Sequence, residues 1–136
     1  MLVCERDGRW AVALRQELPR PEVRVHQTRS VDECWESLAR WPASFVVVEL
    51  TRTNAPALLG RIAWLERDFP LARVAVVADR ALGFCEGLMR EAGAVHFTVS
   101  PRRLGPLGCL ALRHLDAAPP PRLSLTERIW ASLPWG

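Results

Sequence analysis

Short apolar runs alternate along the chain with segments that carry apolar residues at helical spacing. Five of these runs are predicted to be strands, at residues 2–4, 23–26, 45–50, 74–78 and 95–99. The middle runs are apolar apart from Glu49, which is typical of strands that are covered on both faces in a parallel sheet. The alternation of strands and helices predicts repeated β/α units and therefore an α/β fold.

Five helices are expected between and after these runs, at 8–18, 30–40, 55–68, 82–92 and 102–115. The first places Trp10 and Leu14 four residues apart, so that they share one face. The second opens on Ser30 and Glu33, a capping box in which each side chain binds the other residue's free backbone amide. Glycine and proline at 105–108 weaken the start of the last helix, which we expect to begin late or to kink.

A separate element follows the last of these helices. Residues 116–123 include three consecutive prolines, which predict a stiff and extended linker. A short helix is then expected at 124–133, opened by a second capping box of Ser124 and Glu127. Its apolar residues are Leu125, Ile129, Trp130 and Leu133, with Trp135 beyond them. The predicted organisation is a domain at 1–115, a linker at 116–123 and an amphipathic tail at 124–136.

Length and composition limit the class of protein. The chain has 136 residues, of which 49% are hydrophobic and 24% charged, and this is typical of one globular domain that needs no metal or disulfide. The N-terminus lacks the pattern of a signal peptide, and no apolar run reaches the ~20 residues that span a membrane. The four cysteines are far apart, without the close spacing of zinc ligands. We therefore expect a cytoplasmic protein with reduced thiols and no membrane partner.

The sequence offers little chemistry for an enzyme. The three histidines, His26, His96 and His114, lack the spacing of metal ligands, and no Ser-His-Asp set can be assembled. No glycine-rich loop of the kind that holds phosphates is present. The net charge of +3 is mild and acids are interspersed along the chain, which argues against a nucleic-acid partner. We expect no catalytic residue, no metal and no cofactor.

Landmarks at the ends of the apolar runs carry a resemblance to a known family. An acid cluster follows the first run at 5–7, Glu49 stands near the end of FVVVEL, and Ala78 ends VAVVA. Phe97 lies in the last run, and Ser100 follows it before a proline. Over residues 1 to about 115 this pattern resembles the response-regulator receiver domain, which is CheY-like. The resemblance implies a flavodoxin-like three-layer sandwich whose parallel sheet has the strand order 2-1-3-4-5.

The same resemblance implies a phosphoryl-transfer site from which the chemistry is missing. The family uses two acids for Mg²⁺, an aspartate as phosphoryl acceptor, and a Thr/Ser with a Lys to bind the phosphoryl oxygens. The matching positions here are Glu5, Arg6, Glu49, Ala78 and Ser100, and Phe97 matches the family's aromatic switch position. Arg6 puts a cation in the place of a metal ligand, and Glu49 moves its carboxylate out by one methylene. The resemblance therefore implies a degenerate pseudo-receiver that takes no phosphoryl group.

Arginine supplies all 18 basic residues of the chain. In the implied fold, residues that follow the strands meet at the C-terminal edge of the sheet, where ligands of open α/β sheets bind. The arginines expected there are Arg6, Arg9, Arg52, Arg80, Arg102 and Arg103. Of these, Arg6, Arg52, Arg80 and Arg102 form the candidate site for an anion such as phosphate or a nucleotide. The alternative is that the arginines of this edge pair with the neighbouring acids Glu5, Asp7, Glu49 and Asp79.

The preferred function is a non-enzymatic adaptor or assembly module of a signal-transduction system of the two-component kind. Its partner is an unidentified protein or a second copy of the chain, as in a homodimer. The tail is the expected binding element because a helix this short is marginal in water, and tryptophan anchors dominate interface energetics. The tail could equally pack on its own domain. Two rival functions stay open: an anion or nucleotide sensor at the arginine-rich edge, and an atypical receiver that is still phosphorylated.

Overall fold

The computed structural model describes residues 1–119 and 124–133. Its strands are β1 (Leu2–Cys4), β2 (His26–Thr28), β3 (Phe45–Leu50), β4 (Arg73–Ala78) and β5 (His96–Thr98). Its helices are α1 (Arg9–Glu17), α2 (Val31–Arg40), α3 (Ala55–Asp68), α4 (Glu86–Ala92), α5 (Gly105–Ala117) and α6 (Leu125–Ser132), with a 3-10 helix, η1 (Arg80–Cys85), before α4. Part of the predicted linker lies outside the described residues, and so does Trp135 at the end of the predicted tail.

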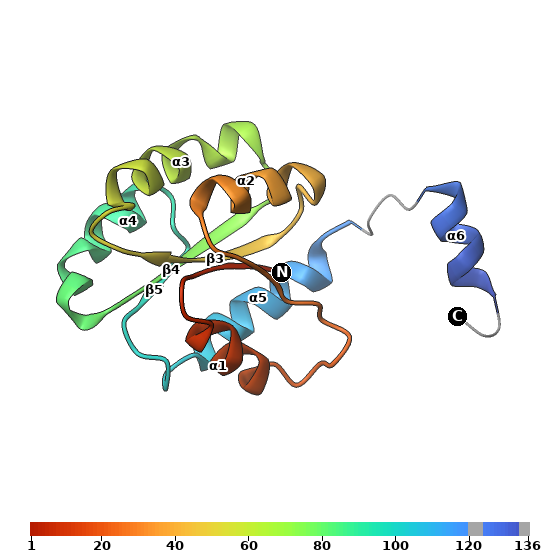
Figure 1. Ribbon diagram of the computed structural model, residues 1–136, viewed down its shortest axis with the longest axis horizontal. Helices are drawn as coiled ribbons and strands as arrows, with labels where there is room; N and C mark the ends of the chain where they lie inside the picture. Colours follow the sequence, from red (N-terminus) through yellow and green to blue (C-terminus); the bar gives the residue numbers. More distant parts are fainter. Residues whose placement is uncertain (120–123, 134–136) are drawn as a thin grey trace.

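The five strands form one parallel sheet in the order β2-β1-β3-β4-β5, and the predicted fold class is confirmed. Helices α2, α3 and α4 cover one face of the sheet, and α1 and α5 cover the other (Figure 1). Each of the first four strands is followed by a helix that leads to the next strand, as right-handed crossovers between parallel strands require. The molecule therefore has three layers.

The core is divided by the sheet into two parts. Along β3, Val46 and Val48 point to the side of α2 and α3, where they belong to a cluster that includes Ile62. Phe45 and Val47 point to the opposite side and pack with the residues of α1 and α5. This alternation follows from the period of two residues along a strand, and it explains why β3 is apolar on both faces.

The second strand lies later in the chain than the sequence predicts. The prediction places it at 23–26, but β2 is His26–Thr28 and pairs with Leu2–Cys4 of β1. The error has a physical cause, since Val25 is partly buried against the core without taking part in the strand ladder. The apolar pattern therefore predicted correctly that this segment is buried, but it predicted the wrong residues for the strand.

The two helices that flank β5 also differ from their simplest prediction. The helix expected at 82–92 is divided into η1, which ends at Cys85, and α4, which begins at Glu86. Gly93 ends α4 with a positive φ of 129°, a conformation that glycine adopts without the strain of a side chain. The last helix of the domain begins at Gly105 rather than at 102, so the predicted late start is confirmed.

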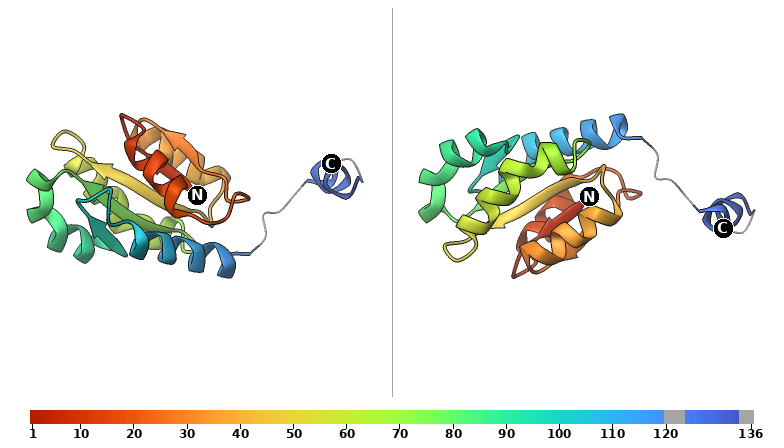
Figure 2. Two further views of the ribbon diagram at one scale, coloured as in Figure 1. Left: turned by 90° about the horizontal axis from the view of Figure 1, so that it is seen from below. Right: turned by 90° about the horizontal axis from the view of Figure 1, so that it is seen from above.

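Helix α6 forms as predicted and stands apart from the sheet domain. Both hydrogen bonds of the predicted capping box are present: Glu127 N–H donates to Ser124 Oγ (3.2 Å), and Ser124 N–H donates to Glu127 Oε2 (2.8 Å). The two views of Figure 2 agree that α6 lies beyond the end of α5, away from the other helices. Among the described residues, none of the helices is both long enough and apolar enough to cross a membrane.

Candidate functional site

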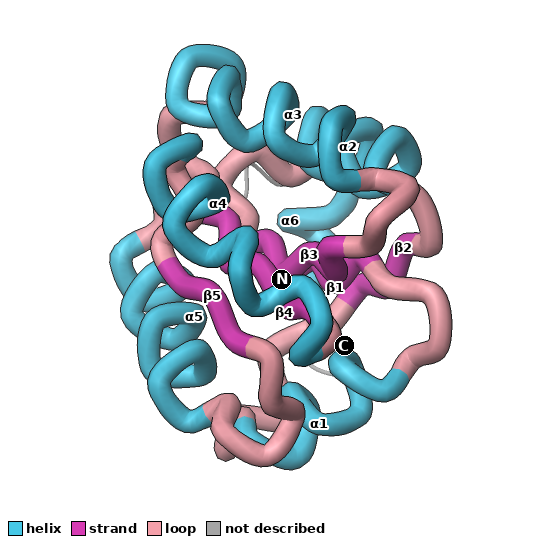
Figure 3. Tube along the Cα trace, turned by 90° about the vertical axis from the view of Figure 1, so that its left-hand side faces the viewer, coloured by secondary structure: helices cyan, strands magenta, loops and turns pink. Residues whose placement is uncertain are grey.

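Three acids meet where the central strands end. Glu5 follows β1, Glu49 is the fifth residue of β3, and Asp79 follows β4. Because β1, β3 and β4 are neighbouring parallel strands, their carboxyl ends lie at one edge of the sheet, which faces the reader in Figure 3. This is the edge at which the sequence places the degenerate phosphoacceptor positions.

Both carboxylate oxygens of Glu5 accept hydrogen bonds from the backbone of α1. The side chain is buried, its Oε2 accepts a hydrogen bond from Trp10 N–H (2.8 Å), and its Oε1 accepts one from Ala11 N–H (2.7 Å). Gly8 stands at the N-cap position of α1 with a φ of 80° and has no side chain to bind these amides. The carboxylate therefore replaces a capping residue, and its negative charge lies at the favourable end of the helix dipole.

Glu49 is held by two groups of the segment that follows β1. Its side chain is only 10% exposed. Oε1 pairs with the guanidinium of Arg9 (3.3 Å), and Oε2 accepts a hydrogen bond from the backbone N–H of Arg6 (3.2 Å). The resemblance assigns Arg6 the place of a metal ligand, but the structure places its backbone, and not its side chain, against Glu49.

Arg9 connects two of the strand ends. The same guanidinium nitrogen that reaches Glu49 also lies 2.5 Å from Oδ1 of Asp79. Hydrogen bonding to Asp79, with the charges of both carboxylates, raises the pKa of Arg9 above its ordinary value. One arginine of α1 thus neutralises an acid near the end of β3 and an acid that follows β4. The sequence places Arg9 among several arginines near this edge and names Glu49 and Asp79 among the acids that could pair with them, but it does not say which arginine pairs with which acid.

This set of donors does not fit a magnesium ion, which the resemblance implies. Magnesium needs oxygen ligands in near-ideal octahedral geometry. Here both oxygens of Glu5 accept backbone N–H groups, and a cation of the chain already contacts Glu49 and Asp79. Within the described residues, no group of three or more His, Cys, Asp or Glu side chains is arranged to hold a metal.

The remaining degenerate positions lie close to this edge but lack the hydroxyl group at 78 and the ammonium group at 100 that the resemblance implies for binding phosphoryl oxygens. Ala78 is fully buried at the end of β4 and has only a methyl group. Ser100 follows β5, and its backbone N–H donates to Oγ1 of Thr98 (3.3 Å). Phe97 is buried in the larger half of the core. The structure therefore brings the five predicted positions and the aromatic position to one region of the fold.

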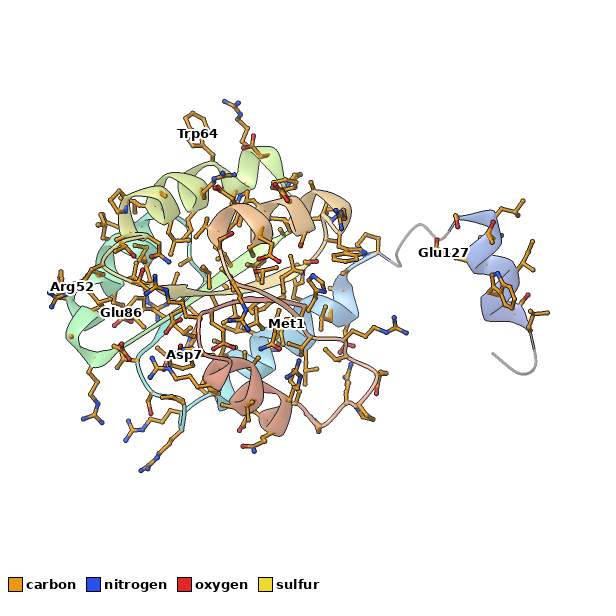
Figure 4. All side chains as sticks on the ribbon, in the orientation of Figure 1. Met1, Asp7, Arg52, Trp64, Glu86 and Glu127 are labelled. Carbon is orange, nitrogen blue, oxygen red and sulfur yellow. The ribbon has the colours of Figure 1, made fainter. Side chains whose placement is uncertain are left out.

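The four arginines of the anion hypothesis are not brought together. Arg6 lines a cleft of about 650 Å³ between α1 and the start of α2, together with Arg29. Arg80 lines a second cleft of about 380 Å³, here called the β5 cleft. The lining of the β5 cleft is Arg80, Gly83, Glu86, Phe97, Thr98, Val99, Ser100 and Arg103. Arg52 and Arg102 line neither cleft, and Arg52 points away from the domain (Figure 4).

Arg103 is the residue of the β5 cleft that the candidate set lacked. It is exposed, and it stands with Arg80 across a cleft whose acid, Glu86, forms an ion pair with Arg90 (3.0 Å). The pair Arg102-Arg103 was visible in the sequence, but nothing there distinguished the two side chains. In the folded chain, Arg103 lines the β5 cleft and Arg102 does not, because of where each lies in the loop after β5.

The solved structures that resemble this chain include two of the CheY-like fold. One is the crystal structure of a response regulator from Thermotoga maritima, with 22% sequence identity and a TM-score of 0.63, covering 85% of this chain and 97% of that chain. The other is a CheY-like protein (tadZ) from Pseudomonas aeruginosa PAO1, with 19% identity and a TM-score of 0.59, covering 88% and 94%. No protein-family model and no curated protein sequence matches the chain. These likenesses show that the fold is the CheY-like fold of response regulators.

Proposed function

We propose that this chain is a pseudo-receiver, a domain with the CheY-like fold that accepts no phosphoryl group and acts in signalling by binding a protein partner. The observation that carries the proposal is the set of contacts around Arg9. Its guanidinium joins Glu49 to Asp79 in the region where phosphoryl transfer would need a metal ion. The carboxylates of this edge are used to hold the fold together.

The tail supports the second half of the proposal, the binding of a partner. Leu125, Ile129 and Trp130 lie on α6 with their side chains exposed, and Trp130 is 63% exposed. An eight-residue helix gains little stability in water from its own hydrogen bonds, so its apolar residues need a surface. A buried tryptophan anchor commonly contributes ~2 kcal/mol or more to an interface.

An affinity pull-down tests the proposal. The tagged full-length chain is incubated with an extract of the native cells, and the protein that it retains is measured. Binding should be unchanged by acetyl phosphate with Mg²⁺ and should be lost in Trp130→Ala. Trp64→Ala is the matched control, because Trp64 is similarly exposed (55%) but lies on α3. Retention that requires acetyl phosphate would contradict the phosphorylation-independent function.

The rival anion-sensing function has one observation in its favour, the placement of Arg80 and Arg103 on the β5 cleft. The two guanidinium groups and the hydroxyl groups of Thr98 and Ser100 can donate hydrogen bonds to the oxygens of phosphate or sulfate. A rise in melting temperature with phosphate, sulfate or a nucleotide, abolished in Arg103→Ala, would support this rival. If none of these anions raises the melting temperature, the anion-sensing function is ruled out.

A further inference from the structure

The sheet domain carries an exposed apolar pair beside the β5 cleft. Phe84, at the end of η1, is 82% exposed, more than any other large hydrophobic side chain in the described part of the chain. Leu88, one helical turn later in α4, is exposed as well. Gly83 and Glu86, which lie between and beside these residues in the sequence, line the cleft. The pair and the cleft therefore form one surface, the η1–α4 surface.

The tail presents a complementary surface. Leu125 and Ile129 are one turn apart, and Trp130 extends their stripe on the side where Glu127 lies one turn earlier. Glu127 uses Oε2 for the capping box and is fully exposed, so that its other oxygen faces solvent. The helix is thus capped before it meets a partner, and it offers an apolar stripe with an acid at one margin.

We infer that α6 of one copy docks on the η1–α4 surface of a second copy of this chain. Trp130 covers Phe84 and the mouth of the β5 cleft, and Glu127 faces Arg80 and Arg103. This inference rests on the proposed function and names its partner. The chemistry matches on both counts, since an apolar stripe meets an apolar pair and a carboxylate meets guanidinium groups that can bind it through two nitrogens.

The position of the tail favours a second copy over the same domain. Helix α5 begins near the C-terminal edge of the sheet and ends at the opposite edge, and in Figure 3 α6 lies behind the domain while η1 and α4 lie in front. The residues 118–124 span at most about 25 Å when fully extended. A six-residue strand such as β4 already covers about 20 Å of the distance back to η1. Return to the same domain would require an almost straight tether.

Reciprocal docking gives a closed dimer with two equal contacts. Each copy supplies one α6 and one η1–α4 surface, so the arrangement has the two-fold symmetry of an isologous dimer. One short helix covers less than the ~800 Å² per partner of a standard interface, and two such contacts together approach it. We expect a dimer that dissociates on dilution.

Analytical ultracentrifugation of the full chain over a concentration series tests the inference. The wild-type chain should form dimers, and Trp130→Ala and Phe84→Ala should each weaken dimerisation at least tenfold, about 1.4 kcal/mol. Trp64→Ala and Leu71→Ala are the matched controls, because both side chains are exposed at positions away from the proposed contact. Glu127→Arg should also weaken the dimer, and Arg103→Glu in the same chain should restore part of the affinity.

Mixing two variants separates exchange between copies from docking within one chain. Trp130→Ala keeps an intact η1–α4 surface, and Phe84→Glu keeps an intact tail. Each should be monomeric alone, and their mixture should form heterodimers through the one contact that remains. A wild-type chain that is monomeric at every concentration, or a dimer that both variants leave unchanged, overturns the inference. Retention of a partner from cell extract is measured independently, so either result leaves the proposed function to its own test.

Discussion

The strand-end site and the tail helix use their side chains in opposite ways. At the strand ends, Glu5 and Glu49 are buried or nearly so, and each accepts hydrogen bonds from the chain itself. On α6, the apolar side chains of Ile129 and Trp130 are exposed to solvent. Charged groups are turned inward in one region, and apolar groups are turned outward in the other.

This contrast indicates where function is to be sought. A carboxylate that binds backbone amides lowers the free energy of the folded state and is no longer available to a metal or a phosphoryl group. An exposed tryptophan contributes nothing to folding until a partner covers it. The strand-end contacts stabilise the domain, and the tail is the region that we propose binds a partner.

The largest expected effect is on stability, from Glu5→Ala. The substitution leaves the amides of Trp10 and Ala11 without acceptors in the core, which should lower the free energy of unfolding by about 2–3 kcal/mol. Urea denaturation measures the change. The control is Asp7→Ala, an exposed neighbour that should change stability by less than about 0.5 kcal/mol. Equal effects of the two substitutions would show that Glu5 is not the cap of α1.

Trp130→Ala should show the reverse behaviour. Its free energy of unfolding in urea should stay within about 0.5 kcal/mol of the wild-type value, because the side chain is exposed. Association should weaken tenfold or more, as measured by ultracentrifugation or by retention of a partner. A tail that packs on its own domain in solution would instead make this variant clearly less stable.

The sequence predicted the sheet of this protein better than its site. The run FVVVEL is easy to assign because a strand covered on both faces is apolar along most of its length, and here Glu49 near its end is the one exception. The edge strand β2 has three residues, of which only Thr28 is buried, so the partly buried Val25 was enough to misplace the predicted strand.

The candidate site could be located from the sequence, but its contacts could not. Spacing along the chain brings Glu49 and Ala78 to one edge, and both lie there. Arg9 contacts Asp79, seventy positions later, and such a pair depends on how α1 packs against β4. Which arginine reaches the acids is therefore decided by tertiary structure. The division of the chain into domain, linker and tail stays a prediction.

Arg9→Ala should have a smaller effect than Glu5→Ala. The side chain of Arg9 is 42% exposed, and solvent screens its ion pairs, so the loss should be about 1 kcal/mol or less. Removing it leaves Glu49 with the Arg6 amide as its remaining partner at this site. Urea denaturation at low and high salt measures the difference, which should shrink as salt is raised. Arg52→Ala serves as the control because Arg52 points outward.

The smallest effect concerns pH. Burial, together with the nearby charge of Arg90, lowers the pKa of His96 below its ordinary value of 6.5. As the pH falls through about 6.5, the unfolded chain therefore takes up a proton that the folded chain does not, and the free energy of unfolding decreases. The melting temperature should fall more steeply below this pH for the wild type than for His96→Gln. Equal slopes would contradict the assignment.

The central claim is that the strand-end carboxylates serve the fold and not phosphoryl transfer. Intact-mass measurement of the full chain after incubation with acetyl phosphate and Mg²⁺ tests it most directly, with Glu49→Gln treated in parallel. The account predicts unchanged and equal masses for treated and untreated protein in both cases, since Arg9 and the Arg6 amide hold Glu49. A stoichiometric phosphoryl adduct on the wild-type chain that disappears in Glu49→Gln would contradict it.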